Sequence, residues 1–244
     1  MKSKRVAIVT GGSRGIGSAI AERLASDGLA VVVNYSSSPK AADEVTQRIT
    51  DAGGEAKSFQ ADVSDADVVK GLFDFATESF GGVDVLVNNA GILKMQTIAE
   101  TSDEEFGRLV DINLKGCFHT MREASRQLRD GGRVINLSSS VIGLRMPNYG
   151  VYSATKAAVE AMSAVLATEL RGRQITVNSV APGPTATKLF LDDKSDELID
   201  RLTKMSPLER LGEPNDIASV VSFLAGPDGA WVNGQTLRAN GGIV

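Results

Sequence analysis

Residues 6–28, VAIVTGGSRGIGSAIAERLASDG, decide the fold. A short apolar run leads into a glycine cluster, and the cluster leads into an amphipathic helical pattern. Gly11, Gly15 and Gly17 follow a G-x-x-x-G-x-G spacing, which differs from the G-x-G-x-x-G dinucleotide fingerprint. This spacing still supplies a tight turn, close backbone approach and a helix N-terminus directed at a pyrophosphate. A glycine-rich turn without a ligand is the alternative, but the position between a first strand and a helix favours nucleotide binding.

Apolar, β-branched runs alternate with helical patterns along the rest of the chain. The expected strands are RVAIV, AVVVNY, AKSFQ, VDVLVNN, GRVINLS, ITVNSVAP and QTLRA. Runs such as AVVV and VDVLV lack polar alternation, which is typical of a parallel sheet covered by helices on both faces. We therefore predict an α/β fold, a doubly wound, Rossmann-like parallel sheet of about seven strands, with ligands outside the carboxyl ends of the strands.

The whole chain, residues 1–244, is expected to form a single dinucleotide-binding and catalytic domain, because it contains no internal repeat, low-complexity tract or linker. Residues 184–207, PTATKLFLDDKSDELIDRLTKMSP, depart from the alternation of strands and helices. The segment is charged, is bounded by prolines and follows a strand directly. We predict that it is an inserted lid over the substrate site.

Composition excludes several classes of chemistry. A chain of 244 residues, 42% hydrophobic and with a net charge of −4, has an ample core and no basic surface for nucleic acid or an anionic membrane. Small metabolites are therefore the expected partners. A single cysteine, Cys117, and a single histidine, His119, leave no His/Cys cluster for a metal and no Ser-His-Asp triad. The apolar run in MKSKRVAIV is too short for a signal peptide, and no segment reaches the ~20 apolar residues of a membrane helix, so a cytoplasmic protein is expected.

The end of the second strand, VVVNYSSS, indicates which dinucleotide binds. NAD sites usually place an acidic residue there to bind the ribose hydroxyls, whereas this strand ends with neutral Asn34 and a run of hydroxyls at 36–38. Arg14, inside the glycine loop, adds a guanidinium suited to a phosphate. A solvated arginine and an ordinary serine turn are the alternative. We predict NADP(H), and we expect Asn34→Asp to shift the preference toward NADH.

Two tyrosines lie in NYGVYSATKAAVE, residues 148–160. A phenol titrates near pH ~10, so a tyrosine that acts as an acid or base near neutrality needs a positive charge beside it. Lys156 follows Tyr152 by four residues and therefore lies one helical turn away on the same face. Tyr149 lies seven residues before this lysine, roughly 10 Å along the helix axis. Tyr152 is therefore the candidate proton donor or acceptor.

Three ordered motifs give the chain a family resemblance. TGGSRGIG at 10–17, NNAG at 88–91 and YSATK at 152–156 resemble the short-chain dehydrogenases/reductases, and the resemblance continues through PG at 182–183 and WVNGQTLRANGG at 231–242. It covers essentially the whole chain.

The resemblance implies a catalytic asparagine, serine, tyrosine and lysine. Their positions are Asn113, Ser139, Tyr152 and Lys156. Ser138 and Ser140 compete with Ser139 for the serine role, and the thirteen-residue step back from the tyrosine that is usual in the family selects Ser139. Lys156 and an oxidised nicotinamide would both stabilise a tyrosine phenolate, and Ser139 would orient the carbonyl oxygen. By resemblance, Asn113 holds a water that links Lys156 to solvent, although an ordinary polar residue inside a helix is the alternative.

Cofactor contacts are assigned by the same motifs together with the glycine loop and the end of the second strand. They are Gly11, Ser13, Arg14, Gly15, Ile16, Gly17, Asn34, Tyr35, Ser36, Asp62, Val63, Asn89, Ala90, Gly91, Tyr152, Lys156, Pro182, Gly183, Thr185 and Thr187. Asn88 is expected to brace the sheet, and Cys117 and His119 are expected to be packing residues.

The resemblance implies an NADPH-dependent reductase that converts a ketone or 3-oxoacyl-type carbonyl into a secondary alcohol, similar to 3-oxoacyl-(acyl-carrier-protein) reductases. The alternatives are an alcohol, sugar or steroid dehydrogenase working oxidatively and a non-catalytic NADP-binding regulator. Arg126, Arg129 and Arg173, interrupted by Asp130, offer an acidic carrier protein only a partial basic dock. The apolar helix pattern NDIASVVSFLAG and the final strand predict a homo-oligomer interface, and the resemblance to similar reductases implies a homotetramer.

Overall fold

The computed structural model describes residues 4–192 and 195–244. Its centre is one seven-stranded sheet in the order β3-β2-β1-β4-β5-β6-β7, in which every pair of neighbouring strands is parallel. The strands are β1 (Val6–Val9), β2 (Ala30–Tyr35), β3 (Glu55–Gln60), β4 (Val83–Asn88), β5 (Leu128–Leu137), β6 (Thr176–Pro182) and β7 (Thr236–Ala239). The doubly wound single domain expected from the sequence is confirmed.

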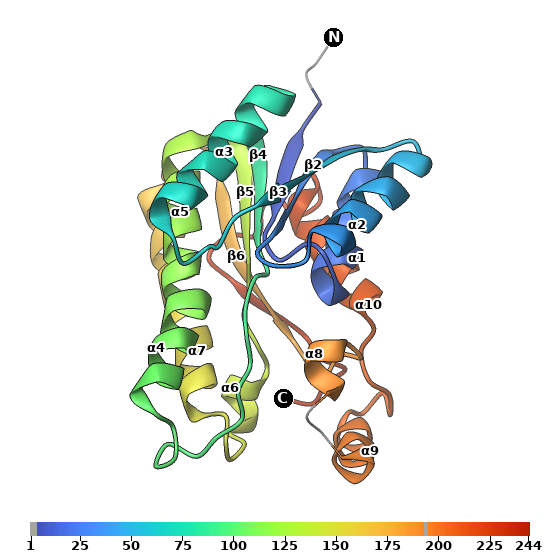
Figure 1. Ribbon diagram of the computed structural model, residues 1–244, viewed down its shortest axis with the longest axis vertical. Helices are drawn as coiled ribbons and strands as arrows, with labels where there is room; N and C mark the ends of the chain where they lie inside the picture. The colour runs from blue at the N-terminus through green and yellow to red at the C-terminus, as the bar shows by residue number, and fades with distance from the viewer. Residues whose placement is uncertain (1–3, 193–194) are drawn as a thin grey trace.

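Helices cover both faces of the sheet (Figure 1). The helical segments are α1 (Gly15–Ser26), α2 (Pro39–Asp51), α3 (Ala66–Phe80), α4 (Asp103–Val110), a π-helix η1 (Asp111–Lys115), α5 (Gly116–Gln127), α6 (Val141–Leu144), α7 (Gly150–Glu169), α8 (Lys188–Leu191), α9 (Asp196–Met205) and α10 (Pro214–Ala225). One apolar layer joins the sheet to α1, α2 and α10, and a second joins it to α3, α5 and α7. All four side chains of β1 are fully buried between these layers, which explains why this strand has no polar alternation.

The strand order reverses beside β1, because β2 and β3 lie on one side of it and β4 to β7 on the other. The loops that follow β1 and β4 therefore diverge and leave a crevice at the carboxyl ends of the strands. Helices α6, α8 and α9 lie beyond these ends, in the lower part of Figure 1. Of the 184–207 segment, residues 193–194 lie outside the described residues.

The apolar face of α10, which was one reason to expect an oligomer interface, packs inside the subunit. Ile217, Val221 and Leu224 on α10 are buried against α1 and the sheet of the same subunit. The apolar face of NDIASVVSFLAG is therefore explained by packing within the chain, because a helix that covers a parallel sheet needs an apolar face of its own.

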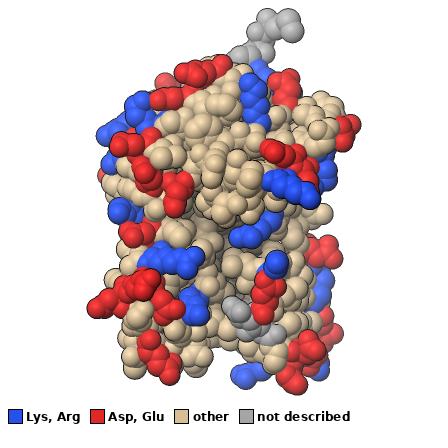
Figure 2. Space-filling model, viewed as in Figure 1, with Lys and Arg blue, Asp and Glu red and all other residues tan. Residues whose placement is uncertain are grey.

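The surface carries mixed charge. Acidic and basic side chains are interspersed over the face drawn in Figure 2. Within the described residues, no helix is long and apolar enough to cross a membrane.

Candidate active site

The glycine loop after β1 has glycines where side chains would collide. Gly11 has φ +59°, and a Cβ there would lie 2.9 Å from the Ala90 Cα. A Cβ on Gly17 would lie 2.2 Å from the Gly11 carbonyl oxygen, so Gly17 lets α1 pack directly against the loop. The backbone amides at the start of α1 are left facing the crevice, as an anion site requires.

A first cavity runs along this loop and contains most of the expected cofactor contacts. It is lined by Gly11, Ser13, Arg14, Gly15, Ile16, Asn34, Tyr35, Ser36, Asp62, Val63, Asn89, Ala90, Gly91 and Thr187. Ser37 and Ser38, the rest of the expected run of hydroxyls, also line it, as do residues that were not expected, namely Ala61, Ile92, Ile112, Lys188 and Leu189. We call this space the cofactor cavity. Its lining combines the glycine loop at the start of α1 with serine hydroxyls and with Asp62 and Val63, which fits a dinucleotide.

Asn34, at the end of β2, was expected to contact the adenosine ribose, but it supports the glycine loop instead. Its side chain is buried, its Oδ1 accepts from the Gly11 backbone amide at 3.2 Å, and its Nδ2 donates to the Ala61 carbonyl at 3.0 Å. The amide therefore braces the glycine loop, and Asn34→Asp would disturb that loop before it altered any ribose contact. Arg14 is exposed at the N-cap of α1 and makes no ion pair within the described chain, so its guanidinium is available to a ligand.

Helix α7 holds Tyr152 and Lys156 one turn apart. The Lys156 Nζ lies 5.8 Å from the centroid of the Tyr152 ring and donates to the Leu137 carbonyl at 2.8 Å. Tyr149 lies at the N-cap of α7 with its ring centroid 6.5 Å from that of Tyr152. Both tyrosines face a second cavity, but Tyr152 is the one with the lysine beside it.

The structure distinguishes the three adjacent serines. The Ser138 hydroxyl donates to Glu160 Oε1 at 2.5 Å, and the Ser140 hydroxyl donates to the Ala181 carbonyl at 3.0 Å. The Ser139 hydroxyl accepts from the Val141 amide at 3.3 Å and is the one of the three whose hydrogen bonding lowers the pKa of the Tyr152 phenol. The serine favoured by the family spacing is thus the serine beside the tyrosine.

Asn113 lies in η1, a π-helical turn that the sequence pattern did not predict. Its side chain is buried and pairs with the backbone of Ile92, accepting from the amide at 2.8 Å and donating to the carbonyl at 2.9 Å. A small cavity of about 10 Å³ lies behind Lys156 and is lined by Asn113, Leu137 and Asn88 among others. A space of this size holds about one water molecule.

Burial shifts the pKa values of the tyrosine and the lysine in opposite directions. Loss of hydration raises the pKa of Tyr152 to about 12, against the lowering effect of the Ser139 hydrogen bond, and it lowers the pKa of Lys156 to about 8. The chain by itself therefore favours the protonated phenol. The phenolate expected beside both Lys156 and an oxidised nicotinamide stays a prediction for the cofactor-bound enzyme, and the Lys156 ammonium is meanwhile hydrogen-bonded to a backbone carbonyl.

Neighbouring polar residues are structural, as expected. Asn88 donates to Asn136 at 2.8 Å inside the sheet, and His119 contacts the Val63 carbonyl. Burial raises the pKa of the Cys117 thiol to about 12, so it is inert at neutral pH.

The remaining expected contacts lie around the second cavity. Tyr152, Lys156, Pro182, Gly183 and Thr185 line it, while Ile16, Asn89, Gly91 and Thr187 line both cavities. The two cavities therefore meet at these shared residues, and one of them, Gly91, lies beside the catalytic lysine, because a Cβ there would be 3.6 Å from the Lys156 Nζ. We call the second one the substrate cavity.

Comparison with known proteins agrees with this geometry. The family model described as enoyl-(acyl carrier protein) reductase matches residues 11–244. A short-chain type dehydrogenase/reductase of Picea abies is 48% identical over 98% of this chain and 92% of its own. The chain belongs to the short-chain dehydrogenase/reductase family. An NADPH-dependent aldehyde reductase-like protein of Arabidopsis thaliana, described as chloroplastic, is also 48% identical, over 98% of this chain and 94% of its own.

Solved structures of the family superpose closely on this short-chain dehydrogenase/reductase. A short-chain dehydrogenase from Burkholderia cenocepacia in complex with NADP has a TM-score of 0.93 and 36% identity, and the match covers 98% of this chain and 97% of that one. The enzyme is therefore an oxidoreductase whose relatives use NADP. Because a relative is described as chloroplastic, family membership leaves the cytoplasmic location a prediction.

Lys188 is the main residue that motif matching missed in this short-chain dehydrogenase/reductase. It follows Thr187, an expected cofactor contact, and lines the cofactor cavity. A cation directly after a residue expected to meet the pyrophosphate was the available indication in the sequence.

Proposed function

We propose that this enzyme transfers a hydride from NADPH to an aldehyde or ketone and releases an alcohol. The observation that carries the proposal is that Ser139 and Tyr152 line the substrate cavity together, with Lys156 one turn behind the tyrosine, and that this cavity shares part of its lining with the cofactor cavity. The bound nicotinamide would supply the hydride, while the protein supplies orientation and a proton.

Each catalytic side chain has a role that its surroundings favour. With a pKa of about 12, the Tyr152 phenol is protonated at neutral pH and can donate to the alkoxide that develops on the carbonyl oxygen. Ser139 orients that oxygen beside the phenol. Reduction uses the protonated phenol as acid, and the reverse oxidation would use the phenolate as base.

Reprotonation of the tyrosine needs a route from solvent. Lys156 has a pKa of about 8, so its ammonium retains the proton at neutral pH. The cavity of about 10 Å³ between Lys156 and Asn113 supports a water in the relay that the family resemblance assigns to Asn113.

The choice of NADP(H) rests on charge at the adenosine end. Arg14 has no ion-pair partner among residues 4–192 and 195–244, and the serines at 36–38 present hydroxyls. The acidic residue that would repel a 2′-phosphate is absent from the end of β2. The NADP-bound Burkholderia structure supports the same choice.

The substrate cavity favours an uncharged, apolar carbonyl compound. Its walls beyond the catalytic residues are Ile92, Leu93, Val141, Leu144, Met146, Tyr149, Pro184, Leu189, Phe190 and Leu202. Among the described residues that line it, Lys156 is the one charged side chain, and it is buried and hydrogen-bonded to a backbone carbonyl. A substrate carboxylate would therefore lose its hydration without gaining a partner. The lining from α8 and α9 supports the proposal that 184–207 acts as a lid.

The surface arginines give little support to docking of an acyl carrier protein. Arg126, Arg129 and Arg173 each form an ion pair within the chain, at 2.9, 3.1 and 2.9 Å. Arg173 also donates to backbone carbonyls of the same subunit. These guanidiniums hold the fold together and offer little free positive charge to an acidic carrier.

The function is tested with a matched pair of aldehydes, followed through NADPH absorbance. We expect methyl 4-formylbenzoate to be reduced with a kcat/KM at least about 10-fold above that of 4-formylbenzoate, a difference equivalent to about 1.4 kcal/mol. A 3-oxobutanoyl thioester serves as the acyl probe. Equal efficiency with ester and carboxylate would rule out the apolar substrate class, and no turnover of any compound would rule out the reductase.

We also propose a homo-oligomer, a tetramer as in similar reductases. Trp231, 98% exposed, and Phe223, 40% exposed, remain uncovered beside β7 and α10. Such apolar side chains are typical of subunit contacts. Light scattering at micromolar concentration should give four 25.7 kDa chains, and a monomer would contradict the proposal.

A further inference from the structure

The cofactor cavity contains a cation to which none of the family motifs assigns a role. Lys188 is the first residue of α8 and lines this cavity together with Arg14 and Gly15. The residue is exposed, and within residues 4–192 and 195–244 its ammonium makes no hydrogen bond or ion pair. Lys204 on α9, in the same segment, differs because it pairs with Asp200 at 2.6 Å.

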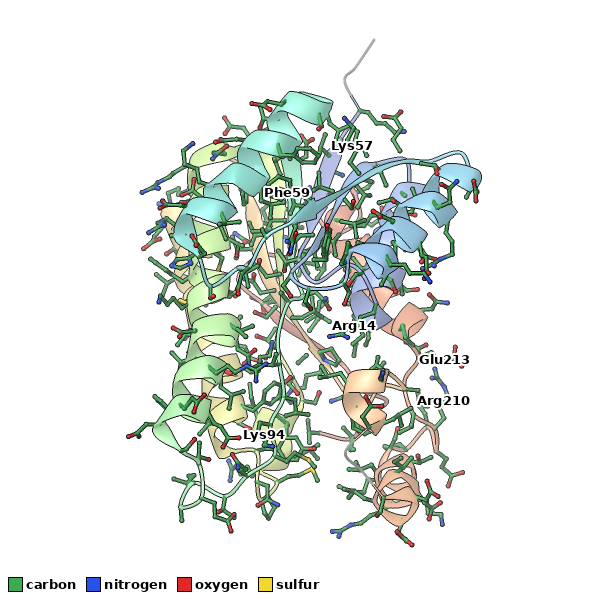
Figure 3. All side chains as sticks on the ribbon, in the orientation of Figure 1. Arg14, Lys57, Phe59, Lys94, Arg210 and Glu213 are labelled. Atoms are coloured by element: carbon green, nitrogen blue, oxygen red, sulfur yellow. The ribbon has the colours of Figure 1, made fainter. Side chains whose placement is uncertain are left out.

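The start of α8 lies against the glycine loop. A Cβ on Gly15 would be 3.4 Å from the Thr187 Cγ2. In Figure 3 the labelled Arg14 lies beside α8, and both line one cavity. Lys188 therefore faces the same space as the amides at the N-terminus of α1, where positive charge already gathers.

The position of Lys188 along the cavity identifies the group it would meet. Lys188 lines the cofactor cavity but not the substrate cavity, and the residue before it, Thr187, packs against Gly15, so Lys188 lies at the glycine loop. The serines at 36–38 line the far end, where the adenosine ribose is expected, and Tyr152 lies on the nicotinamide side. The middle of an extended dinucleotide is its pyrophosphate.

We propose that Lys188 binds the pyrophosphate of the dinucleotide and thereby holds α8 over the glycine loop. The inference rests on the proposed binding of NADP(H) and extends it to the 184–207 segment. NADPH and NADH carry the same pyrophosphate, so Lys188 strengthens both equally. Arg14, at the 2′-phosphate end, distinguishes between them.

The test measures dissociation constants directly, by the change in nicotinamide fluorescence on titration with NADPH and with NADH. Lys188→Ala should raise the Kd of both cofactors by the same factor, about 10-fold, as expected for loss of one charge-assisted contact. Lys188→Arg should retain most of the affinity. Lys204→Ala is the matched control and should leave both Kd values unchanged, because Lys204 pairs on α9 and does not line the cavity.

Three results would overturn the inference. An unchanged Kd in Lys188→Ala would show that the ammonium stays in solvent. A loss confined to NADPH would move Lys188 to the 2′-phosphate. A wild-type protein that bound neither cofactor would remove the proposed function as well, whereas the first two results would leave it standing.

Discussion

Tyr152→Phe is expected to lower kcat for carbonyl reduction by about 10²–10⁴-fold, the usual contribution of a positioned acid. The substitution removes one oxygen and keeps the ring, so packing in the substrate cavity is preserved. The lost oxygen is the proposed proton donor, on a ring whose centroid lies 5.8 Å from the Lys156 Nζ. The Kd for NADPH should stay nearly unchanged, as a fluorescence titration would show.

Tyr149→Phe is the matched control for this prediction. Tyr149 faces the same cavity and is buried, yet it lies at the N-cap of α7 rather than one turn from the lysine. Its loss should alter KM or substrate choice and leave kcat largely intact. Comparable kcat losses in both variants would undo the assignment, and an inactive Tyr149→Phe beside an active Tyr152→Phe would reverse it.

Arg14→Ala is expected to abolish the cofactor preference. The wild type should favour NADPH over NADH in kcat/KM by about 10-fold or more, because a charge-assisted contact contributes about 1.5–3 kcal/mol. Removal of the unpaired guanidinium should weaken NADPH and spare NADH. The NADPH advantage of the wild type should also shrink at high salt, since the exposed contact is screened.

Arg23→Ala provides a control on the same helix. Arg23 pairs with Asp27 at 3.0 Å and does not line the cofactor cavity, so its loss should leave the preference as it is. Equal weakening of both cofactors in Arg14→Ala, or equal efficiency of the wild type with both, would contradict the NADP assignment. The neutral end of β2 would then admit a 2′-phosphate without selecting for it.

The fold could be predicted from sequence because its strands are buried on both faces. Apolar runs such as VAIV at 6–9 have no solvent-facing side, so they stand out as core strands, and the glycine cluster marks the first strand-to-helix turn. The pairing of Tyr152 with Lys156 was equally accessible, because helical geometry alone brings residues four apart together.

Sequence patterns did not predict where the side chains at the edge of the site point. Asn34 turns toward the glycine loop because a parallel strand sends successive side chains to opposite faces, and residue type alone does not tell which face meets the ligand. The hydrophobicity of α10 predicted an apolar face but not its partner, which is the subunit's own core. The sequence did not predict a role for Lys188, because its position at the glycine loop depends on the contact between Gly15 and Thr187, which are far apart in the chain.

Transfer of a deuterium label tests the central claim most directly. The wild type is incubated with methyl 4-formylbenzoate and NADPH that carries deuterium at the transferable C4 position, and the alcohol is analysed by mass spectrometry. The account predicts an alcohol with one deuterium on its carbinol carbon, and almost none in the same time from Tyr152→Phe saturated with the same cofactor. Alcohol without the label, or equal labelled product from both proteins, would contradict it.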